Sequence, residues 1–280
     1  MSTDWRPSDR SIALRRLVVD ALVAAGAGHV GPSLSCLEIL SSLYDGAARH
    51  RPDQPDWPDR DRIILSKGHG CAALYAVLAD HGYFGLDTLS TLCVRDSLLG
   101  GHPERHLVPG VEFSTGSLGH GLSVGVGMAL ALRRRGSQSR VFVILGDGEL
   151  GEGSVWEAVM SAAHHHLANL CVLIDRNGLQ SSGPTAEVLE VEPLADKLTA
   201  FGCAVRSADG HDTRALSAQL RLIPFDAGRP SAIICTTTKG RGVGLAENQA
   251  SWHYRGSFSD AEVAEMRRSL DLLGGGRLPE

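Results

Sequence analysis

Two apolar segments of strand length, each ending in turn residues and a polar side chain, constrain the fold of this chain more than any other feature. The first is Val-Phe-Val-Ile-Leu at 141–145, followed by Gly-Asp-Gly-Glu, and the second is Val-Leu-Ile at 172–174, followed by Asp-Arg-Asn. Residues 154–167 between them have a helical pattern and begin with Ser154-x-x-Glu157, which predicts a capping box. A strand, a helix and a second strand form a βαβ unit, whose two parallel strands end at the same edge of the sheet.

This topology predicts that Asp147 and Asn177 lie together at the carboxyl edge of the sheet, where open α/β sheets bind ligands. A carboxylate and a carboxamide provide hard oxygen ligands, which suit a magnesium ion that also holds phosphate oxygens. Gly146 permits the tight turn, and Gly148 allows the backbone to approach a phosphate closely. Gly-Asp-Gly alone would indicate a simple turn. Its place after a buried strand, with an asparagine after the next strand, favours a binding site instead.

The remainder of the chain alternates helical and strand patterns. Helices are expected at 14–25, after a second capping box at Ser35-x-x-Glu38, at 72–79, from Pro193, from Thr213, and after a third capping box at Ser259-x-x-Glu262. Further strands are expected at 63–65, near 203–205 and at 232–235. We therefore predict an α/β fold in which helices flank a doubly wound parallel sheet of five buried strands. A single domain should cover 1–280, with 271–280 as a frayed tail.

A segment rich in glycine and alanine, at 121–132, carries Gly121, Gly125 and Gly127 within a helical pattern. Glycine weakens a helix, so these residues indicate close approach to a neighbouring element or ligand. They do not form a dinucleotide fingerprint, because no G-x-G-x-x-G follows a strand here.

The composition excludes several classes of protein. The 280 residues are 43% hydrophobic and 21% charged, as in ordinary globular proteins, and the net charge of −5 gives no basic surface for nucleic acid or an anionic membrane. The chain begins Met-Ser-Thr-Asp-Trp-Arg, which is not a signal peptide, and it has no apolar segment long enough to span a bilayer. Its six cysteines form no C-x-x-C pair and are expected to be mostly core residues in a reducing compartment, so we expect a cytoplasmic protein.

The segment GDGELGEGSVWEAVMSAAHHHLANLCVLIDRNGLQ resembles the thiamine-diphosphate signature of the transketolase family. The resemblance extends from near the start to about Trp252-His253 through GHVGPSLSCLEIL, DRIILSKGHGCAALYAVL, GGHPE, GVEFSTGSLGHGLSVGVGMALA, DGHD and TKGRGVG, in the family's order. It covers the amino-terminal, diphosphate-binding (PP-type) domain, whereas family chains usually continue into a pyrimidine-binding domain and a third domain. The resemblance therefore implies the first subunit of a split transketolase, which forms an α₂β₂ complex with a separate pyrimidine-domain subunit.

The resemblance also implies roles for individual residues. The expected ligands of Mg²⁺, or of Ca²⁺ or Mn²⁺ in its place, are Asp147, Asn177 and the backbone carbonyl of Leu179. The residues expected to contact thiamine diphosphate are Lys67, His69, Gly116, Leu118, Gly148, Glu149, Asn177, Lys239 and His253. The catalytic histidines, expected to exchange protons with substrate hydroxyls, are His29, His69, His102 and His253. Any one of these histidines alone would indicate a structural or surface residue, but four at the ends of expected elements favour a shared function.

Other residues qualify the resemblance. Consecutive helical residues point in different directions, so the three histidines at 164–166 are interpreted as helix surface rather than a metal site. Glu152 and Glu157 match glutamates near the family's subunit interface, although Glu157 equally fits the capping box. Pro32 replaces a residue that is often small, and His120 replaces a common glutamine. Both departures suggest a donor or acceptor other than the usual sugar phosphates.

The function that the resemblance implies is a thiamine-diphosphate- and Mg²⁺-dependent transferase. It would move a two-carbon ketol unit from a ketose-type donor to an aldehyde-type acceptor. Two alternatives remain open: another thiamine-dependent subunit, similar to a 2-oxoacid dehydrogenase α subunit or to deoxyxylulose-phosphate synthase, and a non-catalytic cofactor-binding scaffold. The histidines and the stretch FSTGSLGHGLS favour transketolase, and the retained Asp147 and Asn177 weigh against a scaffold.

Overall fold

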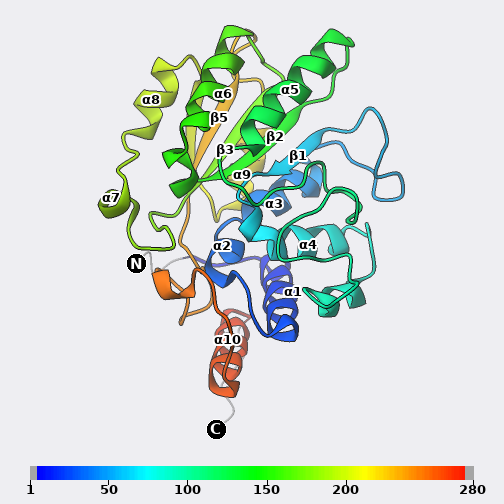
Figure 1. Cartoon of the computed structure of the whole chain (residues 1–280), viewed down its shortest axis with the longest axis vertical. Helices are drawn as coiled ribbons and strands as arrows, with labels where there is room; N and C mark the ends of the chain where they lie inside the picture. Colours follow the sequence, from blue (N-terminus) through cyan, green and yellow to red (C-terminus); the bar gives the residue numbers. More distant parts are fainter. Residues whose placement is uncertain (1–4, 275–280) are drawn as a thin grey trace.

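The computed structural model describes residues 5–274 and confirms the predicted α/β fold. Five parallel strands form one sheet in the order β1-β2-β3-β5-β4 (Figure 1). They are β1 (Arg62–Leu65), β2 (Val141–Gly146), β3 (Leu170–Arg176), β4 (Ala204–Asp209) and β5 (Ser231–Thr236). The prediction that all five are buried is wrong for β4, because this strand lies at the edge of the sheet and its residues are half-buried or exposed.

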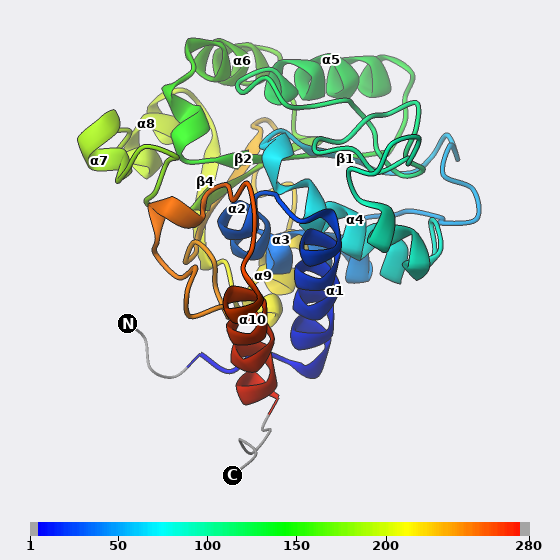
Figure 2. The same cartoon turned by 60° about the horizontal axis from the view of Figure 1, so that its bottom comes forward.

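Helices cover both faces of the sheet, as the doubly wound fold requires (Figure 2). On one face lie α5 (Gly121–Arg134), α6 (Gly153–His164) and α8 (Leu194–Ala200). On the other lie α1 (Asp9–Ala25), α3 (Leu37–Ser42), α4 (Cys71–Asp80) and α9 (Thr213–Leu220). The short helices are α2 (Val30–Ser35) and α7 (Thr185–Val188), and α10 (Asp260–Leu273) packs against α1.

The central strands are buried on both sides because each face of the sheet meets a helical layer. In β2, Phe142 and Ile144 enter the core beneath α3 and α4, whereas Val143 and Leu145 enter the core beneath α5 and α6. Such strands read as continuous apolar segments rather than as an alternating pattern, which is why β2 and β3 are evident in the sequence. Their parallel register places Gly146 opposite Asp175, so both strands end at the same edge.

Of the three predicted capping boxes, only the one at α10 is confirmed. The Ser259 hydroxyl accepts the Glu262 N–H, and the Glu262 carboxylate accepts the Ser259 N–H in return. The box predicted at α6 is wrong, because the helix is capped at Glu152 without a side-chain bond and the Ser154 hydroxyl donates to the Gly119 carbonyl at 2.9 Å. Here Ser154 fastens the loop before α5 instead of its own helix.

The capping box predicted at Ser35 and Glu38 is also wrong. The Ser35 hydroxyl donates to Asp175 Oδ2 at 2.6 Å, and the Glu38 carboxylate pairs with the buried guanidinium of Arg15. Both acceptors and donors lie in the interior, where a charge without a partner is far more costly than an uncapped helix end.

The glycines of α5 allow the close packing that the sequence predicts at two of three positions. A Cβ on Gly121 would lie 2.4 Å from Ser66 Oγ, and a Cβ on Gly125 would lie 2.5 Å from Val143 Cγ2. Gly127 faces open space, so the prediction is wrong there. The first two glycines let α5 lie directly on β1 and β2.

Three further expectations concern the chain as a whole. Helix α10 continues through Leu273, so the tail predicted from 271 is wrong for its first three residues, and 275–280 lie outside the described residues. Five cysteines are buried as expected, and Cys93 is exposed. Over residues 5–274, the structure contains no helix with the length and apolarity needed to cross a membrane.

Candidate active site

A cavity of about 190 Å³ opens at the carboxyl edge of β2 and β3, where the βαβ argument places a binding site. Its wall contains every residue predicted to bind metal or cofactor and three of the four predicted histidines. His29 is the exception, because it does not line the cavity and instead packs against the other histidines. The fold thus brings together predicted residues that are widely separated in the sequence.

The three predicted metal ligands come from the loops that follow β2 and β3. Asp147 Oδ2 accepts the Gly178 N–H at 2.5 Å, and Asn177 Oδ1 accepts the Leu179 N–H at 3.1 Å. The Leu179 carbonyl accepts a hydrogen bond from Lys239 Nζ at 2.7 Å. A carboxylate, an amide and a carbonyl oxygen therefore belong to two adjoining turns of backbone.

The charge of Asp147 indicates how a cation would fit here. Burial raises the pKa of Asp147 to about 6, and the neighbouring carboxylate of Asp175 adds to the rise, against the hydrogen bonds from Gly178 and Gly148. A divalent cation would oppose both raising effects, and an all-oxygen donor set suits Mg²⁺ or Ca²⁺. Residues 5–274 hold no cluster of three or more His, Cys, Asp and Glu side chains arranged for a metal, so a metal here would depend on this mixed donor set.

The floor of the cavity is a buried ion pair that the sequence analysis only half identified. The Lys67 ammonium, 1% exposed, pairs with the fully buried carboxylate of Asp175 and also donates to the Pro32 carbonyl at 3.0 Å. Burial would raise the pKa of Asp175, but Lys67, together with the hydroxyls of Ser35 and Thr237, lowers it overall. An aspartate at the end of the apolar segment Val-Leu-Ile was the available signal for this pair, because a buried carboxylate requires a partner.

Glu149 lines the cavity, but its carboxylate is already committed to the protein. Oε1 accepts the Gly119 N–H at 2.9 Å and the Ser66 hydroxyl, and Oε2 accepts the Gly146 N–H at 3.2 Å. Burial raises the pKa of Glu149, and these three donors oppose that effect. The side chain thus joins the loops after β1 and β2 to the turn before α5.

Lys239 supplies the positive charge that faces the cavity from the segment after β5. Besides Leu179, its ammonium contacts His253 Nδ1 at 2.9 Å. Burial lowers the pKa of Lys239 to about 8, with the like charge of Lys67 as the next cause. An anionic group in the cavity would therefore meet a cation that the surrounding protein does not neutralise.

The four predicted histidines converge in space. The His29 ring lies 5.6 Å from those of His69 and His253 and 5.9 Å from that of His102, measured between centroids, and His69 stacks on His253 at 5.1 Å. Burial is the main cause that lowers the pKa of His29 to about 4 and that of His253 to about 3, and it lowers that of His69 further still. At neutral pH these imidazoles are uncharged, and an uncharged imidazole has one donor and one acceptor nitrogen.

The remaining predicted positions lie at the edges of this site. Pro32 forms part of the cavity wall, and His120, exposed at the start of α5, contacts the Leu118 carbonyl through Nδ1 at 2.9 Å. Glu152 and Glu157 are exposed at the start of α6, so their interface role stays a prediction. The histidines at 164–166 are exposed or half-buried at the end of α6, away from the cavity.

Comparison with known proteins finds one family. A model described as the transketolase thiamine-diphosphate-binding domain matches residues 8–273. One of the two kinds of chain in the apulose-4-phosphate transketolase of Actinobacillus succinogenes is 44% identical over 245 residues, which cover 87% of this chain and 88% of that protein. The 6-deoxy-6-sulfo-D-fructose transketolase subunit SqwG of a Clostridium species is 41% identical over 240 residues, covering 86% of this chain and 87% of that protein.

Solved structures give the same family and a difference in length. A Pichia stipitis transketolase in complex with sedoheptulose 7-phosphate superposes with a TM-score of 0.86 at 31% identity, over 96% of this chain and 42% of that one. The transketolase of Campylobacter jejuni gives a TM-score of 0.86 at 28% identity, over 95% of this chain and 42% of that one. The present chain therefore spans about two fifths of these solved chains but most of the length of the two relatives that are subunits.

Proposed function

Because this chain belongs to the transketolase family through its thiamine-diphosphate-binding domain, we propose that the cavity at the ends of β2 and β3 binds thiamine diphosphate together with Mg²⁺, or Ca²⁺ or Mn²⁺ in its place. One observation carries the proposal: the oxygens of Asp147, Asn177 and Leu179 and a cluster of four histidines belong to the same small region. A metal site alone would not need the histidines, and a histidine cluster alone would not need the oxygen ligands.

Each residue type in the wall suits one part of this ligand. Asp147, Asn177 and the Leu179 carbonyl would hold the metal, since all three present oxygen. Lys239 would lie against the diphosphate, because its ammonium faces the cavity and is paired with no carboxylate in the described part of the chain. Gly116, Leu118 and Gly148 form the parts of the wall where backbone, rather than a long side chain, would meet the cofactor.

The protein's own contribution to the chemistry is proton exchange. Bound thiamine diphosphate supplies a nucleophilic carbon and an electron sink for breaking a carbon–carbon bond. The uncharged imidazoles of His29, His69 and His253 can accept a proton from a substrate hydroxyl at one nitrogen and donate from the other. His102, the exposed member of the cluster, lies where a substrate would arrive from solvent. The reaction proposed is transfer of a two-carbon ketol unit from a ketose to an aldehyde.

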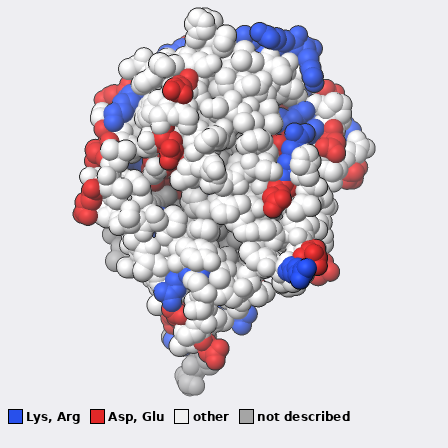
Figure 3. All heavy atoms as spheres, viewed as in Figure 1, with Lys and Arg blue, Asp and Glu red and all other residues white. Residues whose placement is uncertain are grey.

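The proposed enzyme needs a second chain. The relatives named as subunits match this chain over most of their length, whereas the single-chain transketolases are more than twice as long. We propose that a separate subunit supplies the pyrimidine-binding domain, and that the complex is α₂β₂. Figure 3 supports a large interface, because few charges lie across the middle of the face that carries α5 and α6, where Met160 of α6 is 52% exposed. Basic side chains gather instead at the upper edge, over the last turn of α5.

The substrate proposed is a ketose that carries an anionic group. The names of the two relatives contain a sugar phosphate and a sulfonated sugar, which differ in their sugar but share a strong anion. Pro32 narrows the cavity wall at a position where the family often has a small residue. This difference would act on the sugar rather than on the cofactor's diphosphate.

The test begins with the metal and the cofactor. Asp147→Ala should abolish Mg²⁺-dependent binding of thiamine diphosphate, measured by calorimetry on the full chain, while the exposed loop variant Asp59→Ala should bind as the wild type does. A native pull-down with cofactor and Mg²⁺ should then recover a pyrimidine-domain partner, and the pair should transfer a ketol unit. Unchanged affinity in Asp147→Ala would refute the metal assignment, and a chain that binds cofactor but no partner would support the scaffold alternative.

A further inference from the structure

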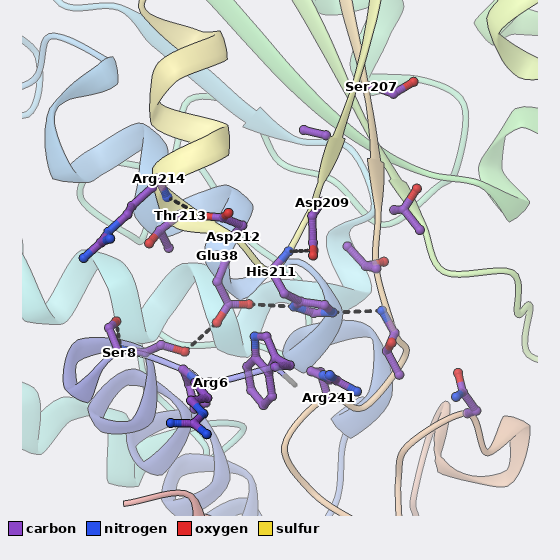
Figure 4. Close-up of a pocket in the computed structure, with 18 residues that line it drawn as sticks. Arg6, Ser8, Glu38, Ser207, Asp209, His211, Asp212, Thr213, Arg214 and Arg241 are labelled. Atoms are coloured by element: carbon purple, nitrogen blue, oxygen red, sulfur yellow. Dashed lines mark hydrogen bonds and ion pairs between the residues drawn. The ribbon is translucent and has the colours of Figure 1, made fainter. Parts of the chain in front are cut away.

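A second and larger cavity, of about 970 Å³, lies beyond the carboxyl ends of β4 and β5, on the side of the sheet that carries α9 (Figure 4). Its wall combines the segment around Trp5 and Arg6 with residues that follow β4, among them His211 and Arg214, and with Arg241, which follows β5. It shares no lining residue with the cofactor cavity. Its volume is that of a site for a small organic molecule.

Two buried donors in this wall have no hydrogen-bond partner. They are the indole N–H of Trp5 and Nε of Arg241, and the described residues contain only two other buried side-chain atoms in this condition, neither of which lines the cavity. Arg241 is 9% exposed and its guanidinium stacks over the Trp5 ring at 4.5 Å. Buried donors are nearly always paired, so two orphans on one wall indicate an acceptor that enters the cavity from outside.

The carboxylates of the wall are already used within the protein. Glu38 Oε2 accepts His211 Nδ1 at 2.9 Å and the other oxygen pairs with Arg15. Asp209 Oδ1 accepts the His211 N–H at 2.8 Å. Asp212 caps α9 by accepting the N–H groups of its first turn at 2.9 and 3.0 Å. None of these oxygens is a free partner for the orphaned donors.

The arginines of the wall, in contrast, retain free donors. Within the described residues, the Arg214 and Arg6 side chains make no hydrogen bond or ion pair, and Arg241 has a single ion pair, to Glu247, at 3.5 Å. Figure 4 shows Arg6 and Arg241 on one side of the hydrogen-bonded pair of Glu38 and His211, and Arg214 on the other. The cavity is therefore surrounded by guanidinium groups whose charge the wall does not neutralise.

We propose that this cavity binds the phosphate group of a small phosphorylated molecule. Guanidinium groups match phosphate oxygens with paired, charge-assisted hydrogen bonds, which would satisfy Nε of Arg241, and the Trp5 indole N–H supplies a further donor. The hydroxyls of Ser8 and Thr213 add neutral donors to the same wall. Because most of the cavity volume remains beyond one phosphate, the ligand has an organic part as well.

The position of the cavity makes the site distinct from, but adjacent to, the cofactor cavity. The Thr238 N–H donates to His211 Nε2 at 2.8 Å, and the Thr237 hydroxyl donates to Asp175, whereas the next residue, Lys239, faces the cofactor cavity. An anion could therefore bind in either cavity, and the experiment has to separate the two.

The experiment is calorimetric titration of the full chain with thiamine diphosphate and Mg²⁺ present in excess, so that an anion does not enter the cofactor cavity. The probes are glycerol 3-phosphate, which has no carbonyl group and cannot act as ketol donor or acceptor, and inorganic phosphate. The variant is Arg214→Gln, whose side chain is exposed and makes no internal contact, and the matched control is Arg95→Gln, 94% exposed and remote from the wall.

We expect saturable binding of glycerol 3-phosphate to one site per chain, weakened about tenfold or more by Arg214→Gln and unchanged by Arg95→Gln. Tighter binding of glycerol 3-phosphate than of inorganic phosphate would support an organic phosphate as the ligand, and equal binding would support recognition of phosphate itself. Absence of saturable binding by both probes, or affinity unchanged by Arg214→Gln, would overturn the proposal. Arg241→Gln, checked for folding by circular dichroism, should weaken binding in the same way.

Discussion

Replacing Asp175 by Asn tests whether the ion pair beneath the cofactor cavity stabilises the fold. The Lys67 ammonium is 1% exposed and the Asp175 carboxylate is fully buried, so neither charge has access to water. Asn keeps the shape and can still accept hydrogen bonds from the hydroxyls of Ser35 and Thr237. The variant therefore removes the charge and little else, and leaves Lys67 as a buried cation without a counter-ion.

The expected loss follows from that geometry. Removing one partner of a buried pair typically destabilises a protein by about 3–5 kcal/mol, because the remaining charge stays desolvated. A domain has a free energy of unfolding of roughly 5–15 kcal/mol, so Asp175→Asn should remove a large fraction of the total. Lys67→Met combined with Asp175→Asn should lose less than the sum of the two single variants, because the double variant leaves no unpaired charge.

The assay is urea unfolding followed by circular dichroism at pH 7, with Asp20→Asn as the matched control. Asp20 pairs with Arg267 at 3.0 Å on the surface, both side chains being more than half exposed, and surface pairs contribute about 0–1 kcal/mol. If Asp175→Asn lowers the free energy of unfolding no more than Asp20→Asn does, the pair does not stabilise the fold and the argument from burial is refuted.

Two further predictions concern the packing of α5 and the charge of the histidine cluster. Gly125→Ala should destabilise the protein by about 1–3 kcal/mol in urea unfolding, because its Cβ would lie 2.5 Å from Val143 Cγ2, whereas Gly127→Ala in the same helix, facing open space, should stabilise it by about 0.5–1 kcal/mol; equal effects would contradict the packing argument. Burial lowers the pKa of His29 to about 4, below the unfolded value near 6.5. The unfolded chain then binds more protons, so stability should fall as pH drops from about 6.5 toward 4. The fall should be smaller in His29→Asn but unchanged in the exposed variant His166→Asn, and an equal fall in all three proteins would exclude His29 as its cause.

The fold was predictable because its central signals are local. Each strand of the βαβ unit is a continuous apolar segment bounded by turn residues, and the parallel register then places Asp147 and Asn177 at one edge without further information. Helix ends were less predictable. The pattern Ser-x-x-Glu was interpreted as a capping box three times, and it forms one only at Ser259, where both side chains are at the surface.

Long-range partners explain the other two failures. Ser35 lies 140 residues from Asp175 in the sequence, and Ser154 lies 35 residues from Gly119, yet each prefers that partner to its own helix. Local patterns identify the residue types that can cap, but tertiary packing decides which atoms are within reach. The edge strand β4 shows the same limit, since its apolar segment does not say which side of the sheet stays open.

The site was more predictable in its members than in their connections. The resemblance identified the residues of the cavity wall but not the role of Asp175, which pairs with Lys67 and accepts two hydroxyls. It also gave no indication of the second cavity, because Trp5, Arg214 and Arg241 lie in three segments that only the fold brings together. A motif records residues that are near one another in sequence or shared by a family, whereas these contacts exist only in three dimensions.

The distribution of charge in the cofactor cavity explains how one small space can bind an anion and still contain neutral bases. Lys67 is neutralised from below by Asp175, so Lys239 is the cation that faces the cavity without a carboxylate partner among the described residues. Burial and the nearby lysines then disfavour a second positive charge on His253 and His29, whose pKa values fall to about 3 and about 4. If Lys67 were unpaired, two cations would act on these imidazoles and on each other, and Lys239 would lose its proton more readily still. The buried pair therefore does more than hold β3 to the loop after β1: it limits the cavity to one free ammonium for the anion while the imidazoles stay uncharged for proton exchange.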